Sequence, residues 1–405
     1  MDNITHALAG ALIAAGSIAM HDPRALRRGR PAFSGGARTA ATIAGVVAAE
    51  LPDADLLYAG ASMGMGKLGY LLHHRGHTHS VLFALLAGAL VWGVTLAFRR
   101  ELREPGARGT LLAIALAGTL SHLALDFTNS YGIHPFWPVV NRWFYGDAVF
   151  IVEPWLFVIA IPALVLLTSS RITRGILSLL LAAMLIAAWS IGAVDRGVAI
   201  ALTLGAVAWS HTMWSAHASR RAPYALLAWL GVEVAFFAAS SAARRTVRDV
   251  VGAEAYRDAV LTPAVGDPFC VNAIVVELDA TIYRASAATV ATVPGVRSAA
   301  RCARGAGTGP SARAGTPALR WGGQFSAPVR ALRELVATNC EIAAAMQFIR
   351  VPVWRRAAGD SVEFADLRYR DGGGGFATIM TARTPARCPD RVPGWVPPRS
   401  DLLGE

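Results

Sequence analysis

Long apolar segments separated by short polar connections occupy the first 243 residues of the chain, and the pattern ends there. Several segments reach the roughly 18–20 residues that an α-helix needs to cross a bilayer. We therefore predict a mainly α protein: a polytopic helical membrane bundle of about seven to eight spans at residues 1–243, then a small soluble α+β domain at residues 244–405. The clearest apolar runs cover residues 4–20, 81–98, 111–125, 148–167, 176–191, 198–209 and 222–240.

The apolar segment at residues 39–58 is interrupted by three acids, Glu50, Asp53 and Asp55. Pro52 disfavours helix at the residue before it, so we expect the acids at a helix end or break. Carboxylates cannot face lipid, which makes this segment short, partly re-entrant or covered by its neighbours.

The C-terminal part shows strand-like patterns at residues 271–283, 362–369 and 376–381 and a helical pattern at residues 328–348. Residues 305–317 are rich in Gly, Pro, Ser and Thr and predict a loop. No spacing of residues in this half is typical of a catalytic site. We interpret it as a binding or lid domain.

The net charge of +11 arises almost entirely from arginine. No basic stripe with interleaved aromatic residues is present, so nucleic-acid binding is disfavoured. In the membrane part the arginines lie mainly between apolar runs, where they report topology. Two loops stand out, one with Arg24, Arg27, Arg28, Arg30 and Arg38, the other with Arg99, Arg100, Arg103 and Arg108.

The positive-inside rule places both arginine-rich loops in the cytoplasm. The beginnings of the first, third and fifth spans and the ends of the second and fourth then lie on the outer side. All the candidate polar residues fall at those ends, which predicts a single polar site on the outer face. They are His6, Glu50, Asp53, Asp55, the histidine cluster at residues 73–79, His122, Asp126, Asp147 and Glu153.

With eight spans both termini lie outside, so the C-terminal domain would face the periplasm or exterior. All four cysteines, Cys270, Cys302, Cys340 and Cys388, belong to that domain. Disulfides are expected in an oxidising compartment, and four cysteines allow three pairings among which the sequence does not choose. Four buried reduced thiols are the alternative.

Four histidines and Arg75 fall within residues 73–79, directly before an apolar run. Neutral imidazole is the commonest protein metal ligand, although a solvated histidine-rich turn would show the same composition. His122 and Asp126 are four residues apart, so they share one face of a predicted helix. Carboxylates combined with imidazoles suit a di- or trinuclear centre of zinc, or of manganese.

The predicted metal ligands are His6, Asp53, Asp55, His74, His79, His122 and Asp126. Arg75 is a candidate clamp for an anionic substrate, or else an ion-pair partner of Asp53 or Asp55. Glu50 and Asp147 are candidate general bases. His73, His77 and His134 are weaker candidates. Zincin, nucleophile-elbow and Walker A motifs are absent from the sequence.

Four motifs in order resemble the DUF457 family of predicted membrane-bound metal-dependent hydrolases, which includes the YdjM-like inner membrane proteins. They are DNITH at residues 2–6, LPDAD at 51–55, HRGHTHS at 74–80 and SHLALD at 121–126. The resemblance covers roughly residues 1–167. Further along, FIRVP at 348–352 and DLRYR at 366–370 look like the second domain of the YfhP-like branch.

The resemblance implies a bacterial inner-membrane protein whose matching histidines and aspartates bind metal. The ligand pattern is also similar to that of zinc-dependent phospholipase C and S1 nuclease, as an analogy only. The leading hypothesis is a membrane-embedded hydrolase at the outer face, acting on a phosphoester or lipid-like small molecule. The alternatives are a non-catalytic scaffold or regulator with a structural metal, and a transporter. Neither the oligomeric state nor the metal follows from the sequence.

Overall fold

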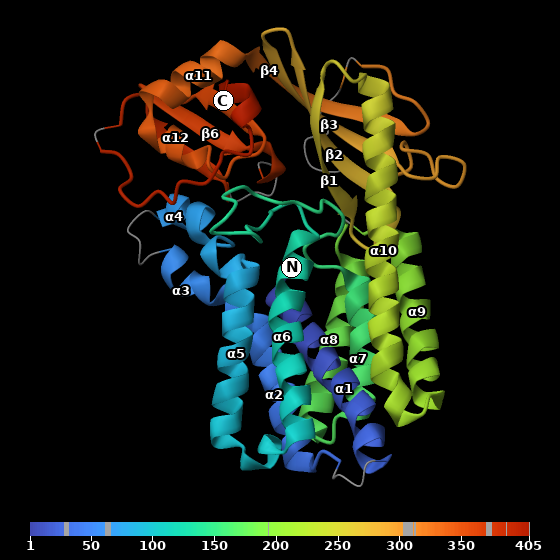
Figure 1. Ribbon diagram of the computed structural model, residues 1–405. Helices are drawn as coiled ribbons and strands as arrows, with labels where there is room; N and C mark the ends of the chain where they lie inside the picture. Colours follow the sequence, from blue (N-terminus) through green and yellow to red (C-terminus); the bar gives the residue numbers. More distant parts are fainter. Residues whose placement is uncertain are drawn as a thin grey trace.

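The computed structural model describes residues 1–27, 32–60, 66–192, 194–302, 311, 313–369, 375–385 and 387–404. Arg28, Arg30, Arg370 and most of the predicted loop at residues 305–317 lie outside these ranges. Within them, a helical bundle carries a domain built of two small sheets at one of its ends (Figure 1). This confirms the predicted fold class.

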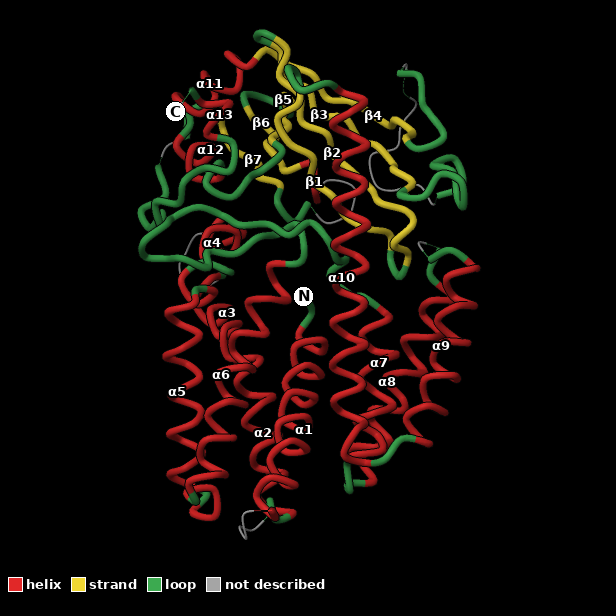
Figure 2. The backbone as a smooth tube through the Cα atoms, turned by 45° about the vertical axis from the view of Figure 1, so that its right-hand side comes forward, coloured by secondary structure: helices red, strands yellow, loops and turns green. Residues whose placement is uncertain are grey.

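Eight helices run alternately down and up the bundle (Figure 2). They are α1 (Asn3–Arg27), α2 (Gly35–Glu50), α5 (Val81–Phe98), α6 (Pro105–Phe127), α7 (Pro154–Leu167), α8 (Arg171–Ser190), α9 (Arg196–Ser215) and α10 (Ala218–Val251). Among the described residues, six of them are long and apolar enough to cross a membrane; α7 is a shorter apolar helix and α2 has 16 residues. The described residues of both predicted arginine-rich loops, which join α1 to α2 and α5 to α6, lie at the end remote from the sheets.

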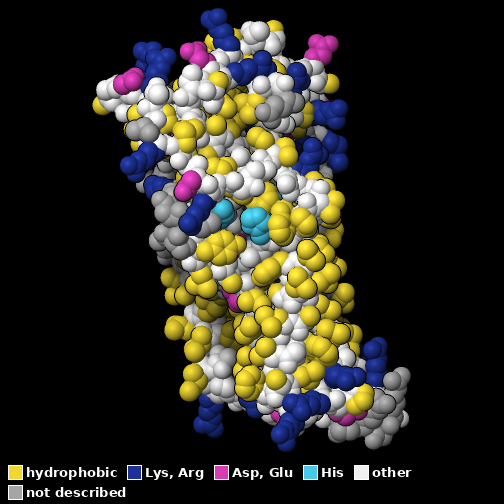
Figure 3. Space-filling model, turned by 60° about the vertical axis from the view of Figure 1, so that its left-hand side comes forward, with side chains coloured by type: hydrophobic (Ala, Val, Ile, Leu, Met, Phe, Trp, Pro, Cys, Tyr) yellow, Lys and Arg dark blue, Asp and Glu magenta, His cyan; other side chains and the backbone are white. Residues whose placement is uncertain are grey.

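On the face of the molecule drawn in Figure 3, hydrophobic side chains cover most of the bundle, and Lys and Arg side chains lie below and above them. Helix α8 is the clearest example of an apolar helix that the protein leaves uncovered, because Ala188 is its only buried side chain. In water such a surface would not stay exposed, whereas in a bilayer it faces lipid. The burial pattern therefore matches that of a membrane bundle.

Local sequence explains where several elements begin and end. Pro52 initiates a 3₁₀ helix, η1 (Leu51–Asp55), so the acids occupy the break predicted after α2. The run at residues 148–167 is helical only from Pro154, because proline fits the first turn and Glu153 caps it. The predicted helix at residues 328–348 is instead two helices, α11 (Val329–Thr338) and α12 (Cys340–Ala345), because Asn339 caps the second one.

The C-terminal domain contains two antiparallel sheets. The first has the order β1 (Tyr256–Ala264), β2 (Asp267–Asp279), β3 (Ile282–Ala291) and β4 (Leu319–Pro328). The second has β5 (Pro352–Arg356), β6 (Ser361–Asp366) and β7 (Thr378–Ala382). The predicted strand at residues 271–283 is wrong in one respect: it turns at Ala280, whose φ is 49°, and joins β2 to β3 in a hairpin.

Two packing units join the domain to the bundle. Helix α10 continues past residue 243, and its Ala243 and Val247 pack against Val271 and Val275 of β2. The short helix α4 (Gly66–His73) contributes Leu71 and Leu72 to a core shared with the C-terminal domain. Because one hydrophobic core spans both parts, the domain is docked rather than tethered.

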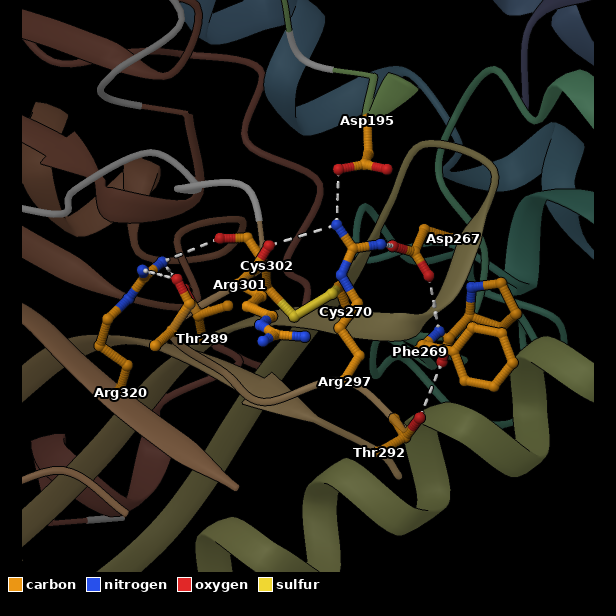
Figure 4. Close-up of a disulfide and its surroundings, with 12 residues drawn as sticks. Asp195, Asp267, Phe269, Cys270, Thr289, Thr292, Arg297, Arg301, Cys302 and Arg320 are labelled. Carbon is orange, nitrogen blue, oxygen red and sulfur yellow. Dashed lines mark hydrogen bonds and ion pairs between the residues drawn. A yellow bond between two sulfur atoms is a disulfide. The ribbon is translucent and has the colours of Figure 1, made fainter. Parts of the chain in front are cut away.

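Two disulfides tie the C-terminal domain, Cys270–Cys302 and Cys340–Cys388. Close to the first one, Arg297 donates to Asp267 of β2 at 2.9 Å and to Asp195, in the α8–α9 connection, at 2.7 Å (Figure 4). This arginine therefore connects the start of β2, next to the Cys270–Cys302 disulfide, to the bundle.

Candidate metal centre

The site lies at the end of the bundle under the C-terminal domain, where the predicted polar ends of the helices meet. Asp55 organises the histidine-rich segment. Its Oδ2 accepts hydrogen bonds from the Arg75 backbone at 2.9 Å and from Thr78 Oγ1 at 2.8 Å, and its Oδ1 lies 2.9 Å from His74 Nδ1. Arg75 has a φ of 62°, a turn conformation that these bonds hold in place. A short 3₁₀ helix, η3 (His77–His79), follows and aims His79 into the bundle.

Four buried side chains converge at one point: Asp53, His79, His122 and Asp126. His79 Nε2 lies 3.1 Å from His122 Nε2, 3.0 Å from Asp126 Oδ2 and 3.3 Å from Asp53 Oδ1. His122 Nε2 lies 3.3 Å from Asp126 Oδ2 and 3.4 Å from Asp53 Oδ1. His122 and Asp126, predicted to share one face of a helix, thus meet His79 and Asp53 at a single site.

These separations fit a bound divalent ion. A tetrahedral site with ligand bonds of about 2.0–2.1 Å has edges of about 3.3–3.4 Å. Asp53 Oδ1 and Asp126 Oδ2 are both buried, and neither has a hydrogen bond of normal geometry from the described residues. Lone pairs that are desolvated and unpaired are costly, and a cation at their common centre would relieve that cost.

The remaining ring nitrogens are held by acceptors. His122 Nδ1 lies 2.6 Å from the Ala49 carbonyl, to which it can only donate. His79 Nδ1 lies 3.4 Å from Asp55 Oδ2. This arrangement fixes the tautomer that leaves Nε2 free as a ligand, as in most histidine metal sites.

A second group, Asp53, Asp55 and His74, also brings three ligand atoms together, and it shares Asp53 with the first. Both oxygens of Asp55 already accept hydrogen bonds, so this group is better arranged for orienting the loop than for enclosing an ion.

The pKa values in the loop segments reflect the same arrangement. Burial alone would raise the pKa of Asp53, but the neighbouring imidazoles of His122 and His79 outweigh it and lower the pKa. Burial alone would lower the pKa of His79, but the carboxylates of Asp126, Asp53 and Asp55 raise it to about 10. Without metal, a proton on the imidazole balances these carboxylates, and a metal ion would take its place.

His6 and Glu50 lie at the edge of the cluster. The His6 ring stacks on His122 at 3.8 Å between centroids, and its Nε2 is 3.3 Å from Asp126 Oδ1. Asn3 belongs to the DNITH motif but was not among the predicted site residues, and it links Glu50 to the site: its Nδ2 donates to Glu50 Oε2 at 3.1 Å and to Asp53 Oδ2 at 3.2 Å. Glu50 Oε1 is buried and unpartnered within the described part of the chain.

The Arg75 side chain forms an ion pair with Asp126. Of the two predicted alternatives, an anion clamp or an ion pair with Asp53 or Asp55, the second named the wrong acids. Arg75 NH2 lies 2.9 Å from Asp126 Oδ1, an oxygen that also contacts the α-amino group of Met1. The reason is the turn at Arg75, which uses the backbone to bind Asp55 and sends the side chain the other way. With Oδ1 so occupied, Asp126 keeps Oδ2 for the centre.

Asp147 does not join the cluster, contrary to its predicted place as a base. Its two oxygens accept hydrogen bonds from Arg350 at 2.8 and 2.9 Å, and Oδ2 also accepts one from Arg244 at 2.8 Å. Arg350 in turn binds Asp258 at 3.0 Å. Two guanidinium groups thus hold this carboxylate, and it links the bundle to the C-terminal domain.

Three other histidines are occupied elsewhere. His73 Nε2 lies 3.0 Å from the Arg391 carbonyl, and His134 Nδ1 lies 3.3 Å from the Arg75 carbonyl. The His77 and His134 rings pack against Trp395 at 4.9 and 3.9 Å between centroids. These histidines contact the covering domain and support the loop from above.

The fold and the buried cluster define a multi-pass membrane protein with a site that can hold a metal ion. Residues 1–198, just under half of the chain, match the family described as YdjM inner membrane protein. The match confirms the resemblance seen in the four motifs. No curated protein and no solved structure matches the chain.

Proposed function

We propose that this protein is a membrane-bound metal-dependent hydrolase that cleaves phosphoester bonds at the outer face of the membrane. The supporting observation is the composition of the site: it holds more polar groups than are needed to complete the coordination of one structural metal ion. Four ligands already complete a tetrahedral structural site. His6, Glu50, Arg75 and the second ligand group remain beside it.

The extra groups match the needs of hydrolysis. A divalent ion, when bound, would polarise a phosphoryl oxygen and make water more acidic. Glu50 shares the Asn3 amide with Asp53 and has one buried oxygen without a partner among the described residues, so it is placed to take the proton of an attacking water. Arg75 adds positive charge next to Asp126, which favours an anionic substrate over a neutral one.

The proposed side of the membrane rests on charge and disulfides. The described arginines of the two loops lie at the end of the bundle opposite the site, which the positive-inside rule places in the cytoplasm. The two disulfides lie in the domain that covers the site, and such bonds persist in an oxidising compartment.

The test is turnover by purified full-length protein loaded with zinc or with manganese. It would be offered a water-soluble phosphodiester, a phosphomonoester and short-chain phospholipids. We expect release of phosphate or alcohol by wild type and none by Asp126→Asn. Wild-type protein that contains metal and leaves every substrate of this set intact would overturn the proposal and leave the structural-metal alternative.

A further inference from the structure

Four hydrogen-bond donors beside the metal centre are buried and bind nothing within the described residues. They are Arg75 Nε, Asn129 Nδ2, Tyr131 Oη and Tyr369 Oη. Three come from the membrane domain, but Tyr369 comes from a 3₁₀ helix in the C-terminal domain, η5 (Leu367–Tyr369). Desolvated donors without acceptors are uncommon in folded proteins, and each calls for an explanation.

The donors belong to one cluster. The Arg75 guanidinium carbon lies 4.7 Å from the centroid of the Tyr131 ring, and the Tyr131 and Tyr369 rings are 6.3 Å apart. Asn129 Oδ1 accepts from Arg75 NH1 at 3.1 Å and from the Tyr131 backbone at 2.8 Å, which orients the amide and leaves Nδ2 unused. The Tyr131 ring also contacts His74 of the histidine segment, at 5.6 Å between centroids.

The position of Tyr369 is set by its neighbours. Arg368 binds Asp366 at 2.8 Å and donates to the Ser130 carbonyl in the bundle, so the end of β6 is fixed against the segment that carries Asn129 and Tyr131. Phe376 packs on Tyr369 at 5.2 Å. The hydroxyl is therefore held in place by the surrounding fold.

We propose that Arg75, Asn129, Tyr131 and Tyr369 form an oxyanion subsite for the phosphoryl group of the substrate, so that the C-terminal domain completes the hydrolytic site. The inference rests on the proposed function and names the group that the site recognises. The chemistry is one-sided: guanidinium and amide nitrogens only donate, and phenols donate readily to an anionic oxygen. A tetrahedral phosphate offers several acceptor oxygens. Some of them can face the metal centre while others accept hydrogen bonds from these donors.

The test measures binding, not turnover. Full-length protein in detergent, loaded with zinc and freed of excess metal, is titrated with inorganic phosphate in a calorimeter. We expect Tyr369→Phe and Tyr131→Phe to raise the phosphate Kd by about 5- to 10-fold each, with metal content unchanged. Tyr283→Phe is the matched control, because its hydroxyl in the same domain is also buried and has no partner among the described residues, but it lies on β3 in the hydrophobic core.

Equal phosphate affinity in wild type, Tyr369→Phe and Tyr131→Phe would overturn the subsite, as would an equal loss in Tyr283→Phe. A repeat with dioctanoyl phosphatidic acid separates the two sources of the group. Tighter binding than free phosphate assigns a lipid headgroup, and equal binding assigns a soluble phosphoester; both require the tyrosine hydroxyls. Turnover without tyrosine-dependent phosphate binding would refute the subsite alone, whereas tyrosine-dependent binding without turnover would refute the hydrolase alone.

Discussion

His79 and His122 face each other through their Nε2 atoms at 3.1 Å, and each also lies within contact of Asp126 Oδ2, at 3.0 and 3.3 Å respectively. Two imidazole nitrogens at this distance can share at most one proton, and two lone pairs would repel. The arrangement is stable with one added proton or with a cation between the rings. The fold thus prepares a cation site before any ion binds.

The first prediction concerns metal content. Purified wild-type protein should hold at least one divalent transition metal, and His122→Ala should hold much less because one of four ligands is lost. His211→Ala, an exposed histidine of α9, is the matched control and should retain the metal. Elemental analysis of the three proteins after dialysis decides; equal metal in all of them would contradict the site.

The second prediction separates catalysis from structure. Glu50→Gln should lower turnover by about 10²–10⁴, the usual contribution of a general base, while metal content and Tm stay near wild type. Glutamine keeps the shape and can still contact Asn3. The exposed Glu254→Gln serves as control. If Glu50→Gln retained full activity, the base would have to be another group.

The third prediction concerns the link between the two domains. Arg350→Met would remove a counter-charge from the buried Asp147 and from the partly buried Asp258, and breaking such a buried pair typically costs about 3–5 kcal/mol. Arg355→Met removes a pair with Glu363 on the surface and should change stability little. Thermal unfolding in detergent gives the comparison. A similar small effect in both variants would show that Arg350 does not hold the domains together.

The fourth prediction is a pH dependence of stability. Burial alone would raise the pKa of Asp258, but Arg350, Arg399 and Arg244 outweigh it and lower the pKa from 3.8 to about 2. Since the folded-state pKa is lower than the unfolded one, the contribution of this group is complete above pH 3.8 and is lost as the pH falls towards 2. The Tm difference between wild type and Asp258→Asn should therefore shrink over that window. A difference that is constant with pH would refute this.

The fifth prediction concerns topology. A reporter enzyme that works only outside the cytoplasm, fused after Ser400, should be active. With both arginine-rich loops in the cytoplasm, the start of α1 and the end of α10 are both expected on the outer side. The unreduced protein, unfolded in denaturant, should show no alkylation of Cys270, Cys302, Cys340 or Cys388, since all four are paired. An inactive reporter together with four alkylated thiols would place the domain in the cytoplasm.

Much of the site follows from the sequence because its residues sit at the ends of strongly apolar helices. The positions of the arginine-rich loops predict how those helices are oriented, and they therefore predict that Asp53, His79 and Asp126 lie on the same side of the membrane. The spacing of His122 and Asp126 fixed their common face. The break before Asp53 followed from proline chemistry alone.

The features that could not be predicted from the sequence depend on contacts between segments that are distant in the chain. The role of Asp147 is decided by Arg350, which arrives from the other domain. The side chain of Arg75 follows a turn that no local pattern announces. Tyr131 and Tyr369 lie in a loop and a short 3₁₀ helix, where aromatic residues show no periodicity that could mark a site.

The contribution of Tyr369 to a site that begins near His6 has a consequence for biogenesis. The two residues come from opposite halves of the chain, and the second one reaches its place only after the C-terminal domain has been synthesised and has docked on the bundle. We expect a nascent or half-inserted chain to be inert towards the phosphoesters of the membrane that receives it. Docking of the C-terminal domain would then be the step that switches on the proposed activity.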